Sequence, residues 1–309
     1  MQRITSVSRS GEQMCRDFRC RNRHIENIMT PITDRAGRFS PLKAATLAGL
    51  TAPALYLVFR YWTGDLGPLP IKEVLLVCGL WAVRFLTLTL ALTPAMRIGN
   101  WPKLALIRRM AGVGAFTYVA LHFMFYIAMS RFDLVLVTTE IVSRIYLTIG
   151  FLALLGLSLL AATSTDRAIR TLGKRWKTLH RGVYAIAVLG LLHFFMQSKI
   201  DASEATLMAG LFLTLMVYRL VIGWRLRFSV PVLAACAVAG ALATAIAEFA
   251  WYGLATGVNP WRIAQANLML AHGLRPAVIV LGAGLIVMLL PLARSLKARV
   301  PSLIASRAV

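Results

Sequence analysis

Three histidines lie within or at the edge of long apolar segments of the chain. His122 and His193 each lie well inside such a segment, and His180 lies at the start of the segment that contains His193. An ionisable side chain is costly inside a bilayer and is therefore a functional candidate there. A neutral imidazole nitrogen is also a common metal ligand. The chemistry that these residues suggest is metal ligation.

His122 and His193 are predicted to lie at matched depth in the membrane. His122 follows Met110, near the start of its segment, by 12 residues, and His193 follows His180 by 13 residues. At about 1.5 Å per helical residue, each lies about 18–19 Å along its helix. Two imidazoles that face each other across a helix bundle can ligate a heme iron from both sides. We therefore predict a heme site at His122 and His193, with two buried neutral histidines as the alternative.

His180 has several possible roles. On an ideal helix, 13 residues turn about 220° beyond complete turns, so His180 and His193 do not share a face. A kink near Gly182 would realign them. His180 is predicted to ligate a second heme, or to contact lipid headgroups or a flavin.

Eight apolar segments are long enough to cross a bilayer, which takes about 20 residues of helix. They cover residues 43–61, 74–94, 110–130, 144–163, 182–199, 205–224, 230–254 and 269–293. Hydrophobic residues make up 58% of the 309 residues and charged residues 15%, too few for a soluble protein of this size. We predict an all-α integral membrane protein with eight transmembrane helices.

The net charge of +22 is distributed as a topology signal rather than as a nucleic-acid-binding surface. One set of connecting segments holds 25 Lys and Arg residues, and the opposite set holds 6. Because positive residues stay cytoplasmic, both termini are predicted to be cytoplasmic. The same charges would attract anionic membrane lipids. No nucleic-acid partner is expected.

Arg84 lies in the middle of the second segment, where a charge needs a partner. No Asp or Glu lies within the first six segments. A heme propionate is one predicted partner, through which Arg84 would raise the reduction potential of the heme. A salt bridge to Asp65 in a connecting loop is the alternative. Arg60 and Arg219 also fall within segments.

The residues around the histidines resemble a known family. The stretch TSTDRAIRTLGKRWKTLHRGVY (163–184) and the later LLHF (191–194) are similar to the ferric-reductase-like transmembrane superfamily. Within it, they resemble the heme-binding membrane subunits of bacterial methionine sulfoxide reductase systems. WAVRFLTLTLALTP (81–94) and RRMAG (108–112) add to the resemblance, which covers about residues 40–229.

This resemblance implies a six-helix core that binds one or two b-type hemes and FMN, with His122, His180 and His193 as the heme histidines. It implies an electron-transfer subunit of an oxidoreductase system rather than a complete enzyme. Electrons would pass from a cytoplasmic flavin reductase or the quinone pool to a periplasmic molybdopterin methionine sulfoxide reductase. The expected location is the bacterial inner membrane.

Two departures from the family pattern bear on the site. Larger ferric reductases carry two histidines on the third helix, but this chain has Arg108 and Arg109 at the earlier position. These arginines are predicted to hold a heme propionate or the FMN phosphate. Two extra helices (230–293) also replace the flavin and nucleotide domain of those enzymes, so nothing in the chain is expected to bind NAD(P)H.

The predicted organisation has four parts: a basic leader (1–40), a ferric-reductase-like domain (41–229), two additional helices (230–293) and a cytoplasmic tail (294–309). Met29 is an alternative start. Two other functions remain open. One is a ferric or other small-molecule transmembrane reductase, and the other is a cofactor-free transporter or scaffold. Inverted repeats would support a transporter, and inspection of the sequence finds no clear internal repeat.

Overall fold

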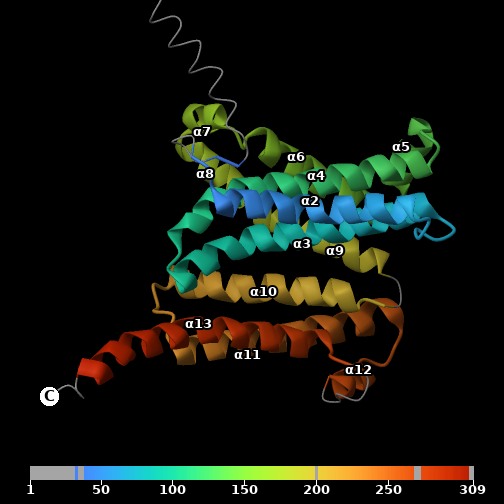
Figure 1. The fold of residues 1–309 in the computed structure, drawn as a ribbon. Helices are drawn as coiled ribbons and strands as arrows, with labels where there is room; N and C mark the ends of the chain where they lie inside the picture. Colours follow the sequence, from blue (N-terminus) through green and yellow to red (C-terminus); the bar gives the residue numbers. More distant parts are fainter. Residues whose placement is uncertain (1–31, 34–37, 199–200, 268–272, 306–309) are drawn as a thin grey trace, which may run out of the picture. The chain divides into compact units, whose positions relative to one another are not determined.

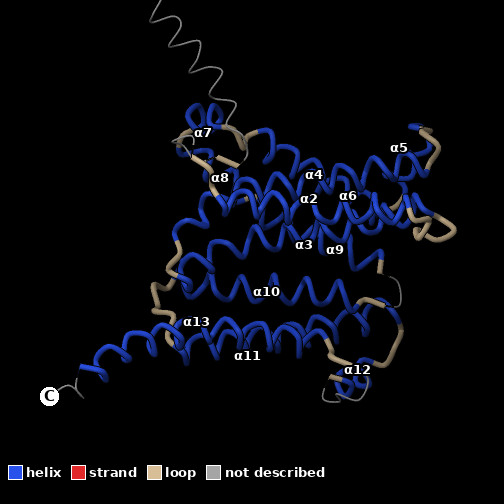
Figure 2. The backbone as a smooth tube through the Cα atoms, in the orientation of Figure 1, coloured by secondary structure: helices blue, strands red, loops and turns tan. Residues whose placement is uncertain are grey.

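The computed structural model describes residues 32–33, 38–198, 201–267 and 273–305, and side chains up to residue 291. Met29 and most of the predicted basic leader lie outside these residues. The described residues form helices joined by loops, and no strand appears among them beyond one isolated bridge between Thr33 and Phe39 (Figure 2). The prediction of an all-α integral membrane protein is confirmed.

The contacts of the chain divide it into two compact units, residues 1–52 and residues 53–309. In the first unit, the Nζ atom of Lys43 donates a 2.8 Å hydrogen bond to the carbonyl of Thr33. This bond holds the short stretch before the first long helix against that helix's first turn. All of the predicted site residues belong to the second unit.

Seven of the eight long helices follow the predicted segments closely, and the last begins later than the predicted segment 269–293, whose residues 269–272 lie outside the described residues, and extends further towards the C-terminus. The eight helices are α2 (Pro41–Trp62), α3 (Pro70–Gly99), α4 (Ala105–Met129), α6 (Ile145–Ala162), α9 (Val183–Gln197), α10 (Ser203–Gly223), α11 (Val230–Trp251) and α13 (Pro276–Ala305). Among the described residues, seven stretches are long and apolar enough to cross a membrane, with α9 counted together with the short α8 (Lys174–Arg181) before it. In α13, the apolar part is the shorter stretch Pro276–Pro291.

Several short helices occupy segments that the sequence analysis treats as connections. They are η1 (Pro102–Leu104), α5 (Leu134–Ser143), α7 (Asp166–Leu172), α8, the π-helical η2 (Tyr252–Thr256) and α12 (Pro260–Ala266). The first turn of α5 is capped by Asp133, whose carboxylate accepts a hydrogen bond from the Leu136 amide. These helices are too short to give a membrane signal, which is why the hydropathy pattern misses them.

Within residues 53–309, two pairs of consecutive long helices form the part that carries the histidines. Helix α3 packs along α4, and α6 packs along α9. Contacts of α4 with α6 and of α3 with α9 join the two pairs. Helix α10 packs against α3 and α9 and also against α11 and α13, and Figure 1 shows α10, α11 and α13 running side by side.

Small residues allow α10 and α11 to approach closely. A Cβ atom added to Gly210 of α10 would overlap the hydroxyl of Thr244 of α11, and one added to Gly240 of α11 would overlap the hydroxyl of Thr214 of α10. Both threonines are buried and donate to the carbonyls four residues earlier. Helices in a membrane associate largely through such close packing of small residues. This reciprocal contact fixes the extra helices to the core.

A buried ion pair joins the last turn of α11 to the start of α13. Glu248 of α11 is fully buried and pairs with Arg275, which lies just before α13. Its second carboxylate oxygen accepts a 2.8 Å hydrogen bond from the Asn267 amide. A charge buried in a membrane protein needs such a partner. The pair therefore ties the end of α11 to the start of α13.

We expect Gly240→Ala to destabilise the protein by about 1–3 kcal/mol, because extra atoms forced into a filled contact displace Thr214 and separate the helices. Thermal unfolding of the detergent-solubilised protein measures this effect as a lower Tm. Gly223→Ala is the matched control, since a Cβ at Gly223 meets no atom within 4 Å. Equal Tm values for the two variants would contradict the role given to the α10–α11 contact.

Candidate functional site

The structure brings His122 of α4 and His193 of α9 together. Their ring centroids lie 6.2 Å apart, and the ring planes make an angle of 82°. The two helices are not direct sequence neighbours, so this approach depends on the packing of α4 on α6 and of α3 on α9. The depth match expected from the sequence therefore agrees with the structure, which places the two rings next to each other.

Each of these imidazoles is anchored through its Nδ1 atom to a neighbouring helix. Nδ1 of His122 lies 2.9 Å from the carbonyl oxygen of Leu75 in α3, and Nδ1 of His193 lies 2.8 Å from the carbonyl oxygen of Tyr146 in α6. A carbonyl oxygen only accepts hydrogen bonds, so Nδ1 must carry the proton in both rings. The Nε2 atom of each neutral ring is then left as a lone-pair donor.

The spacing of the rings fits a single metal ion held between them. A metal–imidazole nitrogen bond is about 2.0 Å long, and half a ring adds about 1.2 Å on each side, so two axial imidazoles on one metal have centroids about 6.4 Å apart. The separation of 6.2 Å agrees with this value. Two histidines without a larger group of metal-ligating side chains among the described residues suit heme, whose porphyrin would supply the other ligands of the iron.

The surroundings of the two histidines repeat along the chain. In both cases the histidine follows its carbonyl partner by 47 residues, and the second set follows the first by 71 residues. The pair α3–α4 thus corresponds to the pair α6–α9. The sequence analysis did not identify this correspondence between the two helix pairs. The shared Leu-His-Phe at 121–123 and 192–194 was a signal for it, although too short to stand out among many apolar residues.

His180 lies apart from this pair. Its ring stacks on Trp176 with centroids 3.9 Å apart, and its Nε2 atom lies 3.1 Å from the hydroxyl of Thr163. Trp176 in turn donates a 2.9 Å hydrogen bond to the Thr163 carbonyl. In the part of the chain that the structure describes, no second histidine is recorded in contact with His180. The structure therefore does not join His180 to the site at His122 and His193.

The arginines that replace family histidines lie at the inner end of the bundle, defined as the end where α3 finishes and α4 begins. Arg109 pairs with Asp166 of α7, and Arg108 donates a 3.3 Å hydrogen bond to the Thr93 hydroxyl.

Arg219 is a member of this inner group that the sequence analysis did not select. It donates a 2.9 Å hydrogen bond to the carbonyl of Leu90 and lies over the ring of Tyr184, 4.8 Å from its centroid. Its Nε atom is buried and has no hydrogen-bond partner among the described residues. The only available signal was an arginine inside an apolar segment, which Arg84 and Arg60 share.

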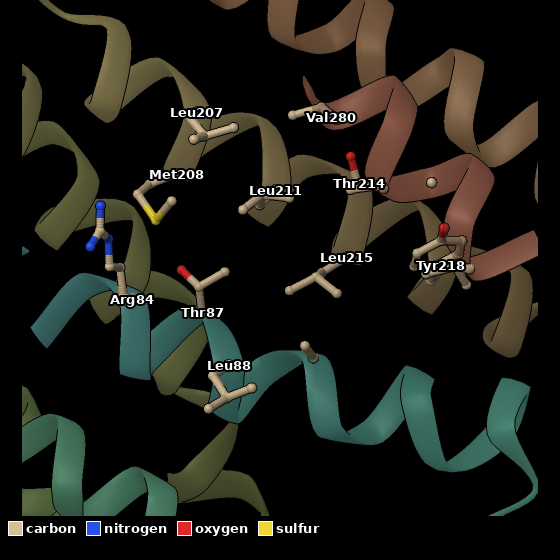
Figure 3. Close-up of a pocket in the computed structure, with 14 residues that line it drawn as sticks. Arg84, Thr87, Leu88, Leu207, Met208, Leu211, Thr214, Leu215, Tyr218 and Val280 are labelled. Carbon is tan, nitrogen blue, oxygen red and sulfur yellow. The ribbon is translucent and has the colours of Figure 1, made fainter. Parts of the chain in front are cut away.

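Arg84 has a protein partner that the sequence analysis did not identify. Its guanidinium pairs with Glu204 at the start of α10, at 3.1 Å, and lies 5.1 Å from the centre of the Trp81 ring. The alternative partner Asp65 pairs with Arg60 instead. Glu204 was overlooked because it lies one residue before the predicted sixth segment. Figure 3 shows Arg84 at one end of a cavity of about 490 Å³, lined by α3, α10 and α13.

Comparisons with known proteins agree with this arrangement. A family model described as "Ferric reductase like transmembrane component" matches residues 78–191. A Rhodospirillum rubrum protein named "Protein-methionine-sulfoxide reductase heme-binding subunit MsrQ" is 42% identical over 198 residues, covering 63% of this chain and 93% of that protein. A protein of the same name from Bordetella pertussis is 38% identical, covering 64% of this chain and 96% of that protein. Another from Azospira oryzae is 36% identical, covering 61% of this chain and 79% of that protein. No solved structure matches.

We expect Arg84→Leu to lower the thermal stability more than the double variant Arg84→Leu/Glu204→Gln. The single change leaves the Glu204 carboxylate without its cation, and the double change removes both charges. A double-mutant cycle measures this: the Tm in detergent is compared for the wild type, both single variants and the double variant. Additive changes in Tm would show that the two side chains do not interact.

Proposed function

We propose that this chain, a member of the MsrQ family, carries electrons through a membrane to a partner methionine sulfoxide reductase. Members of this family are named as heme-binding subunits of protein-methionine-sulfoxide reductase. The observation that supports this most directly is the His122–His193 pair, with ring centroids 6.2 Å apart. A metal held there lies inside a multi-pass helical bundle. Such a position suits electron transfer better than reaction with a large substrate.

The residues that would hold heme b are His122 and His193. Heme, when bound, supplies one-electron redox chemistry, and the protein supplies its ligands and electrostatic surroundings. The two histidines orient their Nε2 atoms by donating a hydrogen bond from Nδ1–H to the carbonyls of Leu75 and Tyr146. We propose one heme at this pair. A second heme at His180 would require Thr163 to release the Nε2 atom of that ring.

The inner end of the bundle is proposed to hold the phosphate of FMN. Arg108 donates a hydrogen bond to the Thr93 hydroxyl at this end, and Arg219 has a buried Nε atom without a hydrogen-bond partner among the described residues. Arginine side chains bind phosphate through charge-assisted hydrogen bonds, which these two side chains could donate. Arg109 contributes less, because Asp166 already neutralises it. Trp176, His180 and Tyr184 add flat rings beside these arginines, against which a flavin ring can stack.

The direction of electron flow follows from the proposed orientation. Lys and Arg residues are concentrated in the connections at the inner end, which supports the proposal that this end and both termini face the cytoplasm and that the protein lies in a bacterial inner membrane. A cytoplasmic flavin reductase or the quinone pool would then donate electrons. A periplasmic molybdopterin methionine sulfoxide reductase would accept them at the opposite end.

We expect His122→Ala and His193→Ala each to remove most of the Soret absorbance of the purified protein, because each variant loses one of the two axial ligands. Heme quantified per polypeptide, on protein with unchanged helical circular dichroism, measures this. His180→Ala is the control and is expected to keep its heme. Full heme in both ligand variants would refute the site, and loss of half the heme in His180→Ala would assign a second heme.

We expect Arg219→Gln to weaken FMN binding about 10-fold or more, because a hydrogen bond to a charged group contributes about 1.5–3 kcal/mol. Titration of FMN into the purified protein, followed by flavin fluorescence, measures the Kd. Arg227→Gln is the control, since Arg227 is an exposed arginine of the same inner end. Equal affinity in the two variants would remove Arg219 from the proposed flavin site.

A further inference from the structure

Each histidine of the pair lies against a glycine of the neighbouring helix. A Cβ atom built on Gly79 of α3 would lie 2.8 Å from Nδ1 of His122 and 3.1 Å from its Cε1. A Cβ atom built on Gly150 of α6 would lie 2.6 Å from Nδ1 of His193 and 2.8 Å from its Cε1. Non-bonded carbon atoms do not approach this closely, so any side chain at either position must displace the ring.

Each glycine lies four residues after the residue whose carbonyl accepts the hydrogen bond from Nδ1–H. Gly79 follows Leu75, and Gly150 follows Tyr146. In an α-helix, side chains tilt towards the N-terminus, so the Cβ atom of residue i+4 lies over the carbonyl of residue i. A glycine at i+4 uncovers that carbonyl. Its oxygen then has a free lone pair beside the regular helix bond and can accept a hydrogen bond from outside the helix.

We propose that Gly79 and Gly150 are positioning residues for the heme ligands, a duplicated device in which a missing side chain exposes a helix carbonyl to the Nδ1 proton of a histidine. This inference rests on the proposed heme function. The arrangement fixes the tautomer of each ring and keeps its Nε2 atom directed away from the glycine helix.

The duplication gives independent support to the device. The glycine precedes its histidine by 43 residues in both halves of the repeat. A single glycine opposite a histidine can result from ordinary close packing of helices. The same glycine, carbonyl and histidine at the same spacing in two helix pairs indicates that the three residues act together, because most other positions of the two pairs differ.

The hydrogen bond also adjusts the electronic properties of the ligand. A histidine that donates its second N–H to an acceptor becomes a more basic metal ligand. A more basic ligand favours the oxidised iron and lowers the reduction potential. Lengthening either bond is therefore expected to raise the potential. Gly150 has the closer contact of the two, so the effect is expected to be larger at Gly150 than at Gly79.

Gly79→Ala and Gly150→Ala test the proposal, with Gly112→Ala as the matched control. Gly112 lies on α4, and a Cβ there meets its nearest neighbour, the Thr89 methyl group, at an ordinary 3.6 Å. We expect changed low-spin g-values in the electron paramagnetic resonance spectrum and a higher midpoint potential in the two test variants, larger in Gly150→Ala, and no change in the control. Wild-type spectra and potentials in both test variants would overturn the proposal.

A measurement on the unmodified protein covers the case in which the variants lose heme altogether. Electron–nuclear double resonance of the oxidised wild type in H₂O and D₂O detects an exchangeable Nδ1 proton on each axial ligand, and its coupling reports a strong hydrogen bond. Ligands without such a bonded proton would refute the device while leaving the heme assignment intact. A wild-type protein without any heme would refute the proposed function itself.

Discussion

The site depends on one interaction that occurs twice, the hydrogen bond from a histidine Nδ1 atom to a carbonyl of the adjacent helix. Each bond joins the second helix of a pair to the first, α4 to α3 and α9 to α6. A buried imidazole in apolar surroundings needs a partner for its N–H group. Here the partner is a backbone atom, so the position of each ring is fixed by the helix packing and not by another mobile side chain.

The charged residues of the bundle show the same requirement for local partners. Arg84 has Glu204, Arg109 has Asp166, and the fully buried Glu248 has Arg275. Arg219 differs, because in the described part of the chain its guanidinium is bound only by a backbone carbonyl and an aromatic ring. Arg108, at the same end of the bundle, has the Thr93 hydroxyl as its hydrogen-bond partner. A partly buried cation such as Arg219 without a carboxylate partner is costly inside a bilayer, and an anionic ligand would remove that cost.

The sequence predicted the membrane helices well and the contacts between them poorly. Hydropathy locates α3 or α10 because a bilayer requires a long apolar run, which a linear pattern records directly. The His122–His193 pair was accessible for a similar reason, since residue counts along parallel helices give depth. The Arg84–Glu204 pair was not accessible, because it depends on how α10 is placed against α3. The role of Arg219 depends in the same way on four helices at once.

The 71-residue correspondence between the two helix pairs holds at the level of His122 and His193 but not at the inner end of the bundle. A shift of 71 residues relates Leu75 to Tyr146, Gly79 to Gly150 and His122 to His193, and it relates Arg109 to His180. At the first three positions the chemistry is retained, and the two rings meet. At the fourth it has diverged, so that Arg109 is bound to Asp166 and His180 to Thr163. Two histidines therefore face each other at one level of the bundle, and at the other level an arginine stands where the 71-residue shift would place a second histidine. The positive charge at that level agrees with the proposal of an anion there.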